Sequence, residues 1–138
     1  MFVSRPLLNH CEFLAWAKSE GFADTVAADK LHVTIATSRG TVNWEQILPC
    51  ATDLTVRVGS RRSVRNFGGV IVLMFSCQRL SRRHAEFRRF GMSWDFPSYS
   101  PHFSFAFDEG VDLGKVRPFL GRLDFGPECF QVDTIHSL

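Results

Sequence analysis

The sequence lacks the features of membrane and exported proteins. No stretch approaches the roughly 20 consecutive apolar residues that a membrane-spanning helix needs. The longest apolar run, Val70 to Phe75, has the length of a strand. The first twenty residues show no charged end followed by an apolar core and a small-residue cleavage site, so no secretory signal is expected. We therefore expect a protein that acts in the cytoplasm.

Cysteine is scarce and irregularly spaced. The four cysteines, Cys11, Cys50, Cys77 and Cys129, form no CxxC pair. Without an export signal, we expect them to be buried thiols and not a disulfide or zinc framework.

Linkers and low-complexity segments are absent, so the 138 residues are expected to form one domain, residues 1–138. At 45% hydrophobic and 22% charged residues, the chain can bury a core, which excludes disorder as its main description. Tyrosine occurs once against fourteen phenylalanines, so much of that core should be aromatic.

Lysine is also rare, because thirteen of the sixteen basic residues are arginine. Nine arginines and one acid fall between Arg57 and Arg89, so this segment carries +8 and the rest of the chain −6. The arginine fork suits phosphate, which indicates an anionic ligand such as a phosphate ester. A solvated helix face beside an edge hairpin explains the same charge, and charge alone favours that second interpretation.

Hydrophobic periodicity and turn residues predict an α+β fold with antiparallel sheets. Gly68-Gly69 suggests a hairpin turn that joins residues 54–59 to a central strand, Val70 to Phe75. The expected helices are Leu7 to Glu20, Trp44 to Leu48 capped by Asn43, Ser81 to Phe90 with Leu80, Phe87 and Phe90 inward, and Asp112 to Leu120; the other expected strands are Leu31 to Thr37, His102 to Phe107 and Phe130 to Ile135.

Two of the predicted strands match each other about half a chain apart. Residues 31–36 read Leu-His-Val-Thr-Ile-Ala and residues 101–106 read Pro-His-Phe-Ser-Phe-Ala. The strand period of two places His32, Thr34 and Ala36 on one face. The same period places His102, Ser104 and Ala106 opposite an inward row of Phe103, Phe105 and Phe107. Each strand therefore presents a histidine and a hydroxyl away from the core. A purely structural role for both histidines is the competing interpretation.

Paired His-x-Thr/Ser strands resemble the 2H phosphoesterases. That resemblance implies two pseudo-symmetric lobes, with antiparallel sheets lining a central cleft and helices outside. Residues 31–39, 42–44 and 91–102 are similar to the phage anti-CBASS phosphodiesterases, which degrade cyclic di- and trinucleotide signals of a bacterial immune system. The resemblance implies a cyclic oligonucleotide substrate, no metal or cofactor, no membrane and no stable protein partner. If the chain is phage-encoded, it implies action in the host bacterial cytosol.

The resemblance also implies roles for residues. Two imidazoles can hold opposite protonation states near neutral pH, so His32 and His102 would act as general base and general acid, in either order. The hydroxyls of Thr34 and Ser104 would donate to the phosphate oxygens. The product would be a linear oligonucleotide with a 3′-phosphate.

Four further residues are candidates for substrate binding, each with a structural alternative. Trp94 and Tyr99 would stack on bases or cover the core. Arg39 would contact phosphate or is a surface charge at a strand end. Glu128 would read a base edge or lies in an exposed turn.

Two other functions fit the same sequence. One is an RNA 2′,3′-cyclic or 2′-5′ phosphodiesterase. The other is a non-catalytic, arginine-rich module that binds nucleotides or RNA.

Overall fold

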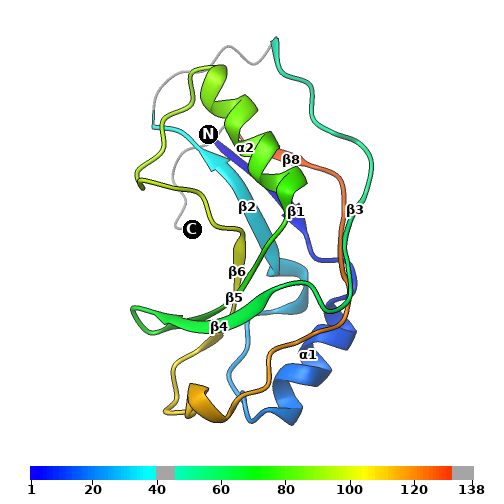
Figure 1. Cartoon of the computed structure of the whole chain (residues 1–138), viewed down its shortest axis with the longest axis vertical. Helices are drawn as coiled ribbons and strands as arrows, with labels where there is room; N and C mark the ends of the chain where they lie inside the picture. Colours follow the sequence, from blue (N-terminus) through cyan, green and yellow to red (C-terminus); the bar gives the residue numbers. More distant parts are fainter. Residues whose placement is uncertain (40–45, 132–138) are drawn as a thin grey trace.

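The computed structural model describes residues 1–39 and 46–131, and its strands form three antiparallel sheets (Figure 1). Two of the sheets have three strands, in the orders β2-β1-β8 and β4-β5-β6, and the third pairs β3 with β7. The strands are β1 (Phe2–Pro6), β2 (His32–Thr37), β3 (Leu54–Val56), β4 (Arg62–Phe67), β5 (Val70–Phe75), β6 (His102–Phe107), β7 (Leu123–Phe125) and β8 (Cys129–Gln131). The helices are α1 (His10–Ser19) and α2 (Gln78–Arg89), with short 3-10 turns at Ala28–Lys30 and Leu113–Lys115. The α+β class and the antiparallel sheets are confirmed.

The chain repeats one arrangement twice. In each half a central strand leads into a helix and then into an edge strand that carries a histidine, as β1-α1-β2 and as β5-α2-β6. Each helix packs against the sheet of the other half. Phe13 of α1 meets Phe103 and Phe105 of β6 edge-to-face at 4.9 and 5.1 Å, and Phe87 of α2 meets Phe130 of β8. The two halves are therefore held together because the helix of each half packs on the sheet of the other.

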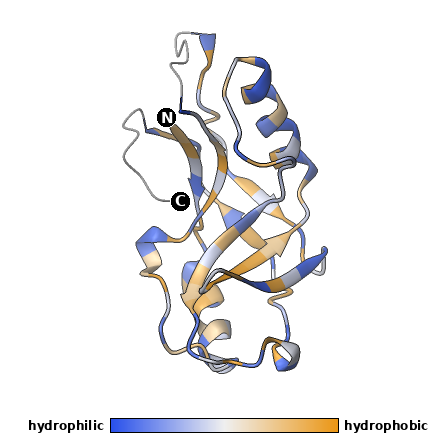
Figure 2. Ribbon diagram, turned by 90° about the vertical axis from the view of Figure 1, so that its left-hand side faces the viewer, coloured by the Kyte–Doolittle hydropathy of each residue, from blue (hydrophilic) through white to orange (hydrophobic). Residues whose placement is uncertain are grey.

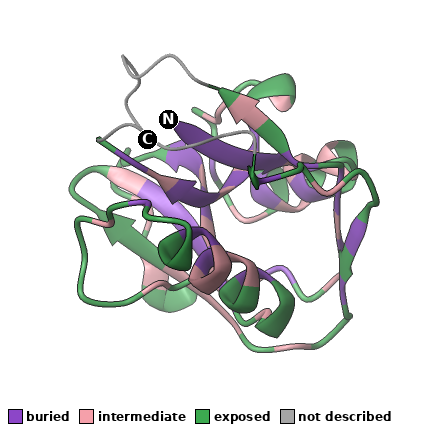
Figure 3. Cartoon of the chain, turned by 90° about the horizontal axis from the view of Figure 1, so that it is seen from above, coloured by how far each residue is buried: buried purple, intermediate pink, exposed green. Residues whose placement is uncertain are grey.

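The core is aromatic, as the composition predicted. Five phenylalanines are fully buried, and hydrophobic residues follow the strands through the middle of the molecule (Figure 2). The outer surfaces of the helices are exposed, whereas the strands between them are buried (Figure 3). The fully buried phenylalanines are Phe13, Phe87, Phe103, Phe105 and Phe125.

Several predicted elements differ from the structure. Pro6 ends strand β1 instead of opening the first helix, so α1 begins only at His10. The Gly68-Gly69 turn is confirmed, because both glycines have positive φ, but it joins β5 to β4 and not to residues 54–59. Strand β3 pairs instead with β7.

Smaller differences concern side chains and element ends. Phe90 was expected inward but is 41% exposed, because the helix ends there. The helix predicted from Asp112 shrinks to one 3-10 turn over Leu113–Lys115, because Pro118 cannot continue it. The Asn43 cap and Trp44, and the strand beyond Gln131, lie outside the described residues.

The cysteines are free, as expected, but they are not buried. Cys11 and Cys129 are exposed, and Cys50 and Cys77 are half-buried. None of the helices in residues 1–39 and 46–131 has the length and apolar character to cross a membrane.

Candidate active site

The two histidine strands are neighbouring edges of different sheets. Strand β2 ends one three-stranded sheet and β6 ends the other, and the two strands pack against each other. His32 and His102 are each partly exposed near the start of their strands. The structure thus brings the two predicted histidine strands together from opposite halves of the chain.

Each of the two histidine rings is oriented by a hydrogen bond of the same kind. Nδ1 of His32 lies 2.8 Å from the carbonyl oxygen of Lys30, and Nδ1 of His102 lies 2.8 Å from the carbonyl oxygen of Ser100. A carbonyl oxygen only accepts, so Nδ1 must carry the proton in both rings. Nε2 is therefore the basic nitrogen of each neutral imidazole.

A phenylalanine packs edge-on against each histidine ring. The centroid of Phe2 lies 5.6 Å from that of His32, and the centroid of Phe67 lies 5.4 Å from that of His102. With the Nδ1 bonds, these contacts restrict both rings to one orientation. The match between the two halves extends from the motif to its surroundings.

A β-bulge interrupts each histidine strand at the same place. In the first pair Val3 faces Ala36 while Ser4 faces Thr34, which leaves Ile35 as the extra residue. In the second, Ile71 faces Ala106 while Val72 faces Ser104. Bulges of this kind re-aim side chains and are common beside active sites.

Because of the bulges, part of the prediction of which residues share the histidine face is wrong. Ala36 and Ala106 were expected beside the histidines but are 2% and 0% exposed. Phe107 was expected inward but is 46% exposed. Each bulge shifts the strand by one residue, so every position beyond it changes face. Thr34 and Ser104 precede the shift and stay on the face of their histidines.

The lead-in segment of each half bonds to the histidine strand of the other. The hydroxyl of Tyr99 donates to the carbonyl oxygen of Thr34 at 2.7 Å. In the opposite direction, the amide of Val26 donates to the carbonyl oxygen of Phe105 at 2.8 Å, and Phe107 donates to Asp24. These bonds satisfy backbone groups that an edge strand leaves unpaired, and they fix β2 and β6 relative to each other.

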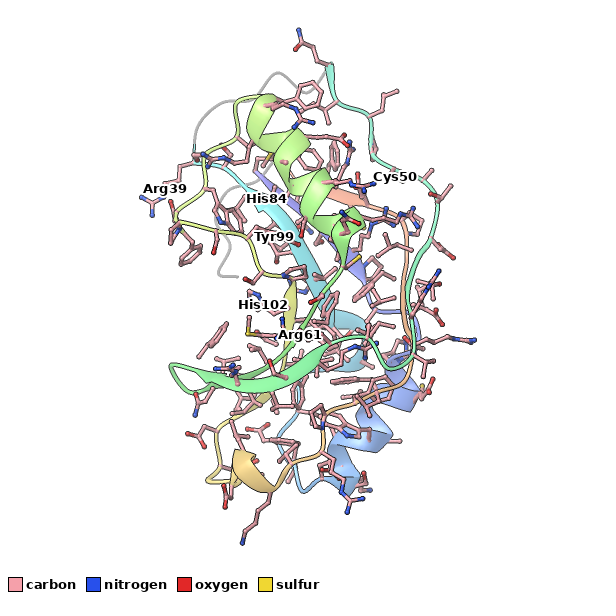
Figure 4. The ribbon with its side chains drawn as sticks, viewed as in Figure 1. Arg39, Cys50, Arg61, His84, Tyr99 and His102 are labelled. Atoms are coloured by element: carbon pink, nitrogen blue, oxygen red, sulfur yellow. The ribbon has the colours of Figure 1, made fainter. Side chains whose placement is uncertain are left out.

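His84 of α2 supports the same stretch of β2. Its Nδ1 donates to the carbonyl oxygen of the bulged Ile35 at 2.8 Å, and its ring stacks on Tyr99 with centroids 4.3 Å apart. Burial lowers the pKa of His84 and raises that of Tyr99, so both groups are kept neutral. Figure 4 shows His84 and Tyr99 above His102, between α2 and β6. The sequence reasoning missed this role, although His84 lies on the inward face of α2 with Leu80 and Phe87.

The four predicted substrate-binding residues lie in different surroundings. Trp94 is half-buried and meets His84 and Tyr99 edge-on, at 4.6 and 5.7 Å. One face of the Tyr99 ring stacks on His84 and its hydroxyl binds the carbonyl oxygen of Thr34, so these contacts are structural. Arg39 points outward and pairs with Asp95 at 3.0 Å, with 83% of its side chain exposed (Figure 4).

Glu128 lies on the opposite face of its sheet from the histidine. Its carboxylate is fully buried and accepts two hydrogen bonds from Arg83 and one from the backbone amide of Cys50, all at 2.9 Å. Arg5 lies 3.9 Å away and is paired in the sheet with the buried Val33. The predicted exposed turn is therefore wrong, and in this conformation the carboxylate does not reach the face of His32.

No metal site accompanies the histidines in the described part of the chain. Nowhere in residues 1–39 and 46–131 do three histidine, cysteine or acidic side chains come together as ligands of one ion would.

The chain is similar to known proteins in sequence and in fold. The family model described as anti-CBASS protein Acb1 matches residues 1–134. A crystal structure described as that of a phosphoesterase superposes with a TM-score of 0.59 at 18% identity, over 90% of this chain and 82% of its own. That likeness supports the 2H-like fold.

Curated relatives carry the same family description. Anti-CBASS protein Acb1 of Caulobacter sp. (strain RHG1) is 45% identical over 138 residues, and that of Sphingomonas paeninsulae is 44% identical over 139 residues. These alignments cover 95% and 94% of this chain but only 22% of either relative, so the chain spans about a fifth of their length. Acb1 of Escherichia phage RB16 is 31% identical over 80% of this chain and 64% of the relative. The chain belongs to the anti-CBASS protein Acb1 family.

Proposed function

We propose that this protein is a phosphodiesterase that hydrolyses the 3′-5′ bonds of cyclic di- and trinucleotide second messengers, and so antagonises CBASS antiphage signalling. Family membership supports the biological role. The observation that carries the chemistry is the matched pair of Nδ1 hydrogen bonds, which gives His32 and His102 the same tautomer on adjoining edge strands.

The two imidazoles divide the proton transfers. Nε2 of one neutral histidine accepts the proton of the ribose 2′-hydroxyl, which then attacks the adjacent phosphorus. Nε2 of the other, protonated histidine donates to the departing 5′-oxygen, and the bond between phosphorus and that oxygen breaks. A 2′,3′-cyclic phosphate results. The Nδ1 bonds keep both rings in place, because their carbonyl partners accept from the neutral and from the charged imidazole.

The second step reverses these roles. The histidine that lost its proton takes one from water, and the hydroxide attacks the cyclic phosphate. The bond between phosphorus and the 2′-oxygen breaks, and the histidine that gained a proton returns it to that oxygen. The product is a linear oligonucleotide with a 3′-phosphate.

The hydroxyls of Thr34 and Ser104 stabilise the phosphate during both steps. Each lies two residues beyond its histidine, before the bulge and on the same face. Fixed hydroxyl donors oppose the negative charge that develops on the non-bridging oxygens. Trp94 is the candidate for stacking on a base, and Arg39 is available once it leaves Asp95.

We also propose that residues 1–138 form one domain with two pseudo-symmetric lobes. The reaction takes place in the cytosol of the bacterial host, needs no resident metal, and has the cyclic oligonucleotide as its partner.

A panel of cyclic di- and trinucleotides, with products resolved by mass, tests the proposal. Linear products bearing a 3′-phosphate, formed equally with and without EDTA, are expected. Linear RNA ending in a 2′,3′-cyclic phosphate and 2′-5′ oligoadenylates belong in the same panel. Preferential cleavage of either would show that the natural substrate is linear and not cyclic. Recovery of every ligand intact would show that the protein is a binding module and not an enzyme.

A further inference from the structure

An arginine-lined hollow adjoins the second histidine strand. It has a volume of about 590 Å³ and lies between β4, the end of β5, the first turn of α2 and the residues that lead into β6. Ser100 and Pro101, which directly precede His102, form part of its wall. In Figure 4, Tyr99, His102 and Arg61 follow one another from α2 down towards β4.

The register of the sheet places this hollow on the histidine face. His102 faces Met74 of β5, and Met74 faces Ser63 of β4. In the next row Ser104 faces Val72, which faces Arg65. Partners in an antiparallel pair project to the same face. Ser63, Arg65 and Met74 line the hollow and share the face of His102 and Ser104.

Two of the three arginines in the wall are available to a ligand. Arg61 and Arg65 are exposed, and in the described part of the chain neither guanidinium has a hydrogen bond or an ion pair. Arg62 differs, because its guanidinium donates to the carbonyl oxygens of Arg57, Phe119 and Gly121. Arg62 thus serves the fold, whereas Arg61 and Arg65 present unpaired charge.

We infer that this hollow is a second phosphate subsite, in which Arg61 and Arg65 hold the phosphodiester of the cyclic oligonucleotide that is not being cleaved. The inference rests on the proposed function. A cyclic oligonucleotide carries at least two phosphates in one ring, and the histidine pair engages only one of them. The strands of Ser104 and Arg65 are two strand spacings apart, about 10 Å, so the two arginines are suited to a phosphate further round the ring. Guanidinium groups match its two non-bridging oxygens, and Ser63, Ser76 and Ser81 add hydroxyl donors in the same wall.

Equilibrium binding tests the subsite without depending on turnover. The probe is a cyclic dinucleotide whose 2′-hydroxyls are replaced by hydrogen, and the comparison ligand is a linear 2′-deoxy dinucleoside with a single phosphodiester. The test variant is Arg61→Gln/Arg65→Gln. The matched control is Arg89→Gln/Arg117→Gln, which removes the same charge from two exposed arginines outside the hollow.

The test variant should bind the ring about tenfold to a hundredfold more weakly than the wild type, and the single-phosphate ligand less than about twofold more weakly. The control should weaken both ligands slightly and equally. The salt dependence of ring binding should also become shallower in the test variant alone.

The subsite would be overturned by equal weakening of both ligands, by a test variant that behaves like the control, or by a wild type that does not bind the ring. An effect of the two arginines on linear oligonucleotides but not on the ring would assign the hollow to linear RNA and equally contradict the inference. A wild type that binds the ring through Arg61 and Arg65 but never cleaves its ribose form would overturn the proposed function and leave the subsite standing.

Discussion

The hydroxyl of Tyr99 donates a 2.7 Å hydrogen bond to the backbone carbonyl of Thr34. Tyr99 lies three residues before His102, and Thr34 lies two residues after His32. This bond crosses from the lead-in of β6 to the bulged part of β2. The backbone bond from Val26 to Phe105 makes the converse connection. The relative position of two edge strands from different sheets therefore depends on a few polar contacts and on the helices that cross between the halves.

Replacing Tyr99 by phenylalanine tests that connection. The change leaves the carbonyl of Thr34 without its donor, so the free energy of unfolding should fall by about 1 kcal/mol. The value of kcat should fall while KM changes little, because the hydroxyl positions Thr34 and is not expected to touch the substrate. Urea unfolding and steady-state kinetics measure the two effects. Phe96→Leu, an exposed change in the same segment, is the control, and equal kcat for Tyr99→Phe and the wild type would refute the positioning role.

The pH dependence of stability should report on His84. Burial lowers the pKa of His84 in the folded state, so below about pH 6.5 the unfolded chain binds more protons at this residue. The contribution of His84 to the free energy of unfolding is complete above pH 6.5 and declines as the pH falls through the window below it. Tyr99 and Trp94 face the ring without bringing charge, and the nearby Arg88 also disfavours protonation.

The comparison variant is His84→Asn, which keeps a donor for Ile35 but does not titrate. Urea unfolding at pH 7.5 and pH 5.5 should show a smaller loss of stability for this variant than for the wild type. All other ionisable groups are the same in both proteins, so their contributions cancel from the difference. Identical losses would mean that His84 is not held neutral.

Changing Glu128 to glutamine should damage the fold and leave substrate binding intact. The fully buried carboxylate pairs with Arg83 and adjoins the buried Arg5, so its loss leaves Arg5 without an acidic neighbour and Arg83 with Glu86 alone. The expected cost is about 3 kcal/mol in the free energy of unfolding. Glu109→Gln, in an exposed turn, should cost almost nothing. If Glu128→Gln left the free energy of unfolding unchanged and raised KM tenfold, Glu128 would instead contact a base of the substrate.

Alanine at His32 or at His102 should each lower kcat by about 10²- to 10⁴-fold, because each change removes one proton transfer. His10→Ala changes a histidine outside the two strands and serves as the control. Single-turnover assays measure the chemical step directly. A loss of less than tenfold in either variant would show that the histidine concerned is not a proton carrier.

The sequence predicted best what depends on local pattern. Period-two alternation located the strands of His32 and His102 and their buried rows up to Ile35 and Phe105. Gly91, with positive φ, ends α2 as expected, because glycine tolerates that backbone conformation.

What depends on pairing was not predictable from one sequence. Strand β4 is largely polar and partly exposed, so its strand character comes from the turn and from its partner β5. An extra residue such as Ile35 has no sequence signal, and its effect on Ala36 follows only from the register. The partners of Glu128 lie 45 residues or more away in the chain, so no local pattern indicates its burial.

The central claim is that a ribose 2′-hydroxyl of the substrate attacks the phosphorus between the two histidines. Its most direct test compares cleavage of a cyclic dinucleotide with cleavage of the same ring in which both 2′-hydroxyls are replaced by hydrogen, with products resolved by mass. We expect the ribose ring to be converted to a linear 3′-phosphate and the deoxy ring to bind and stay intact. Cleavage of the deoxy ring at a comparable rate would contradict the mechanism.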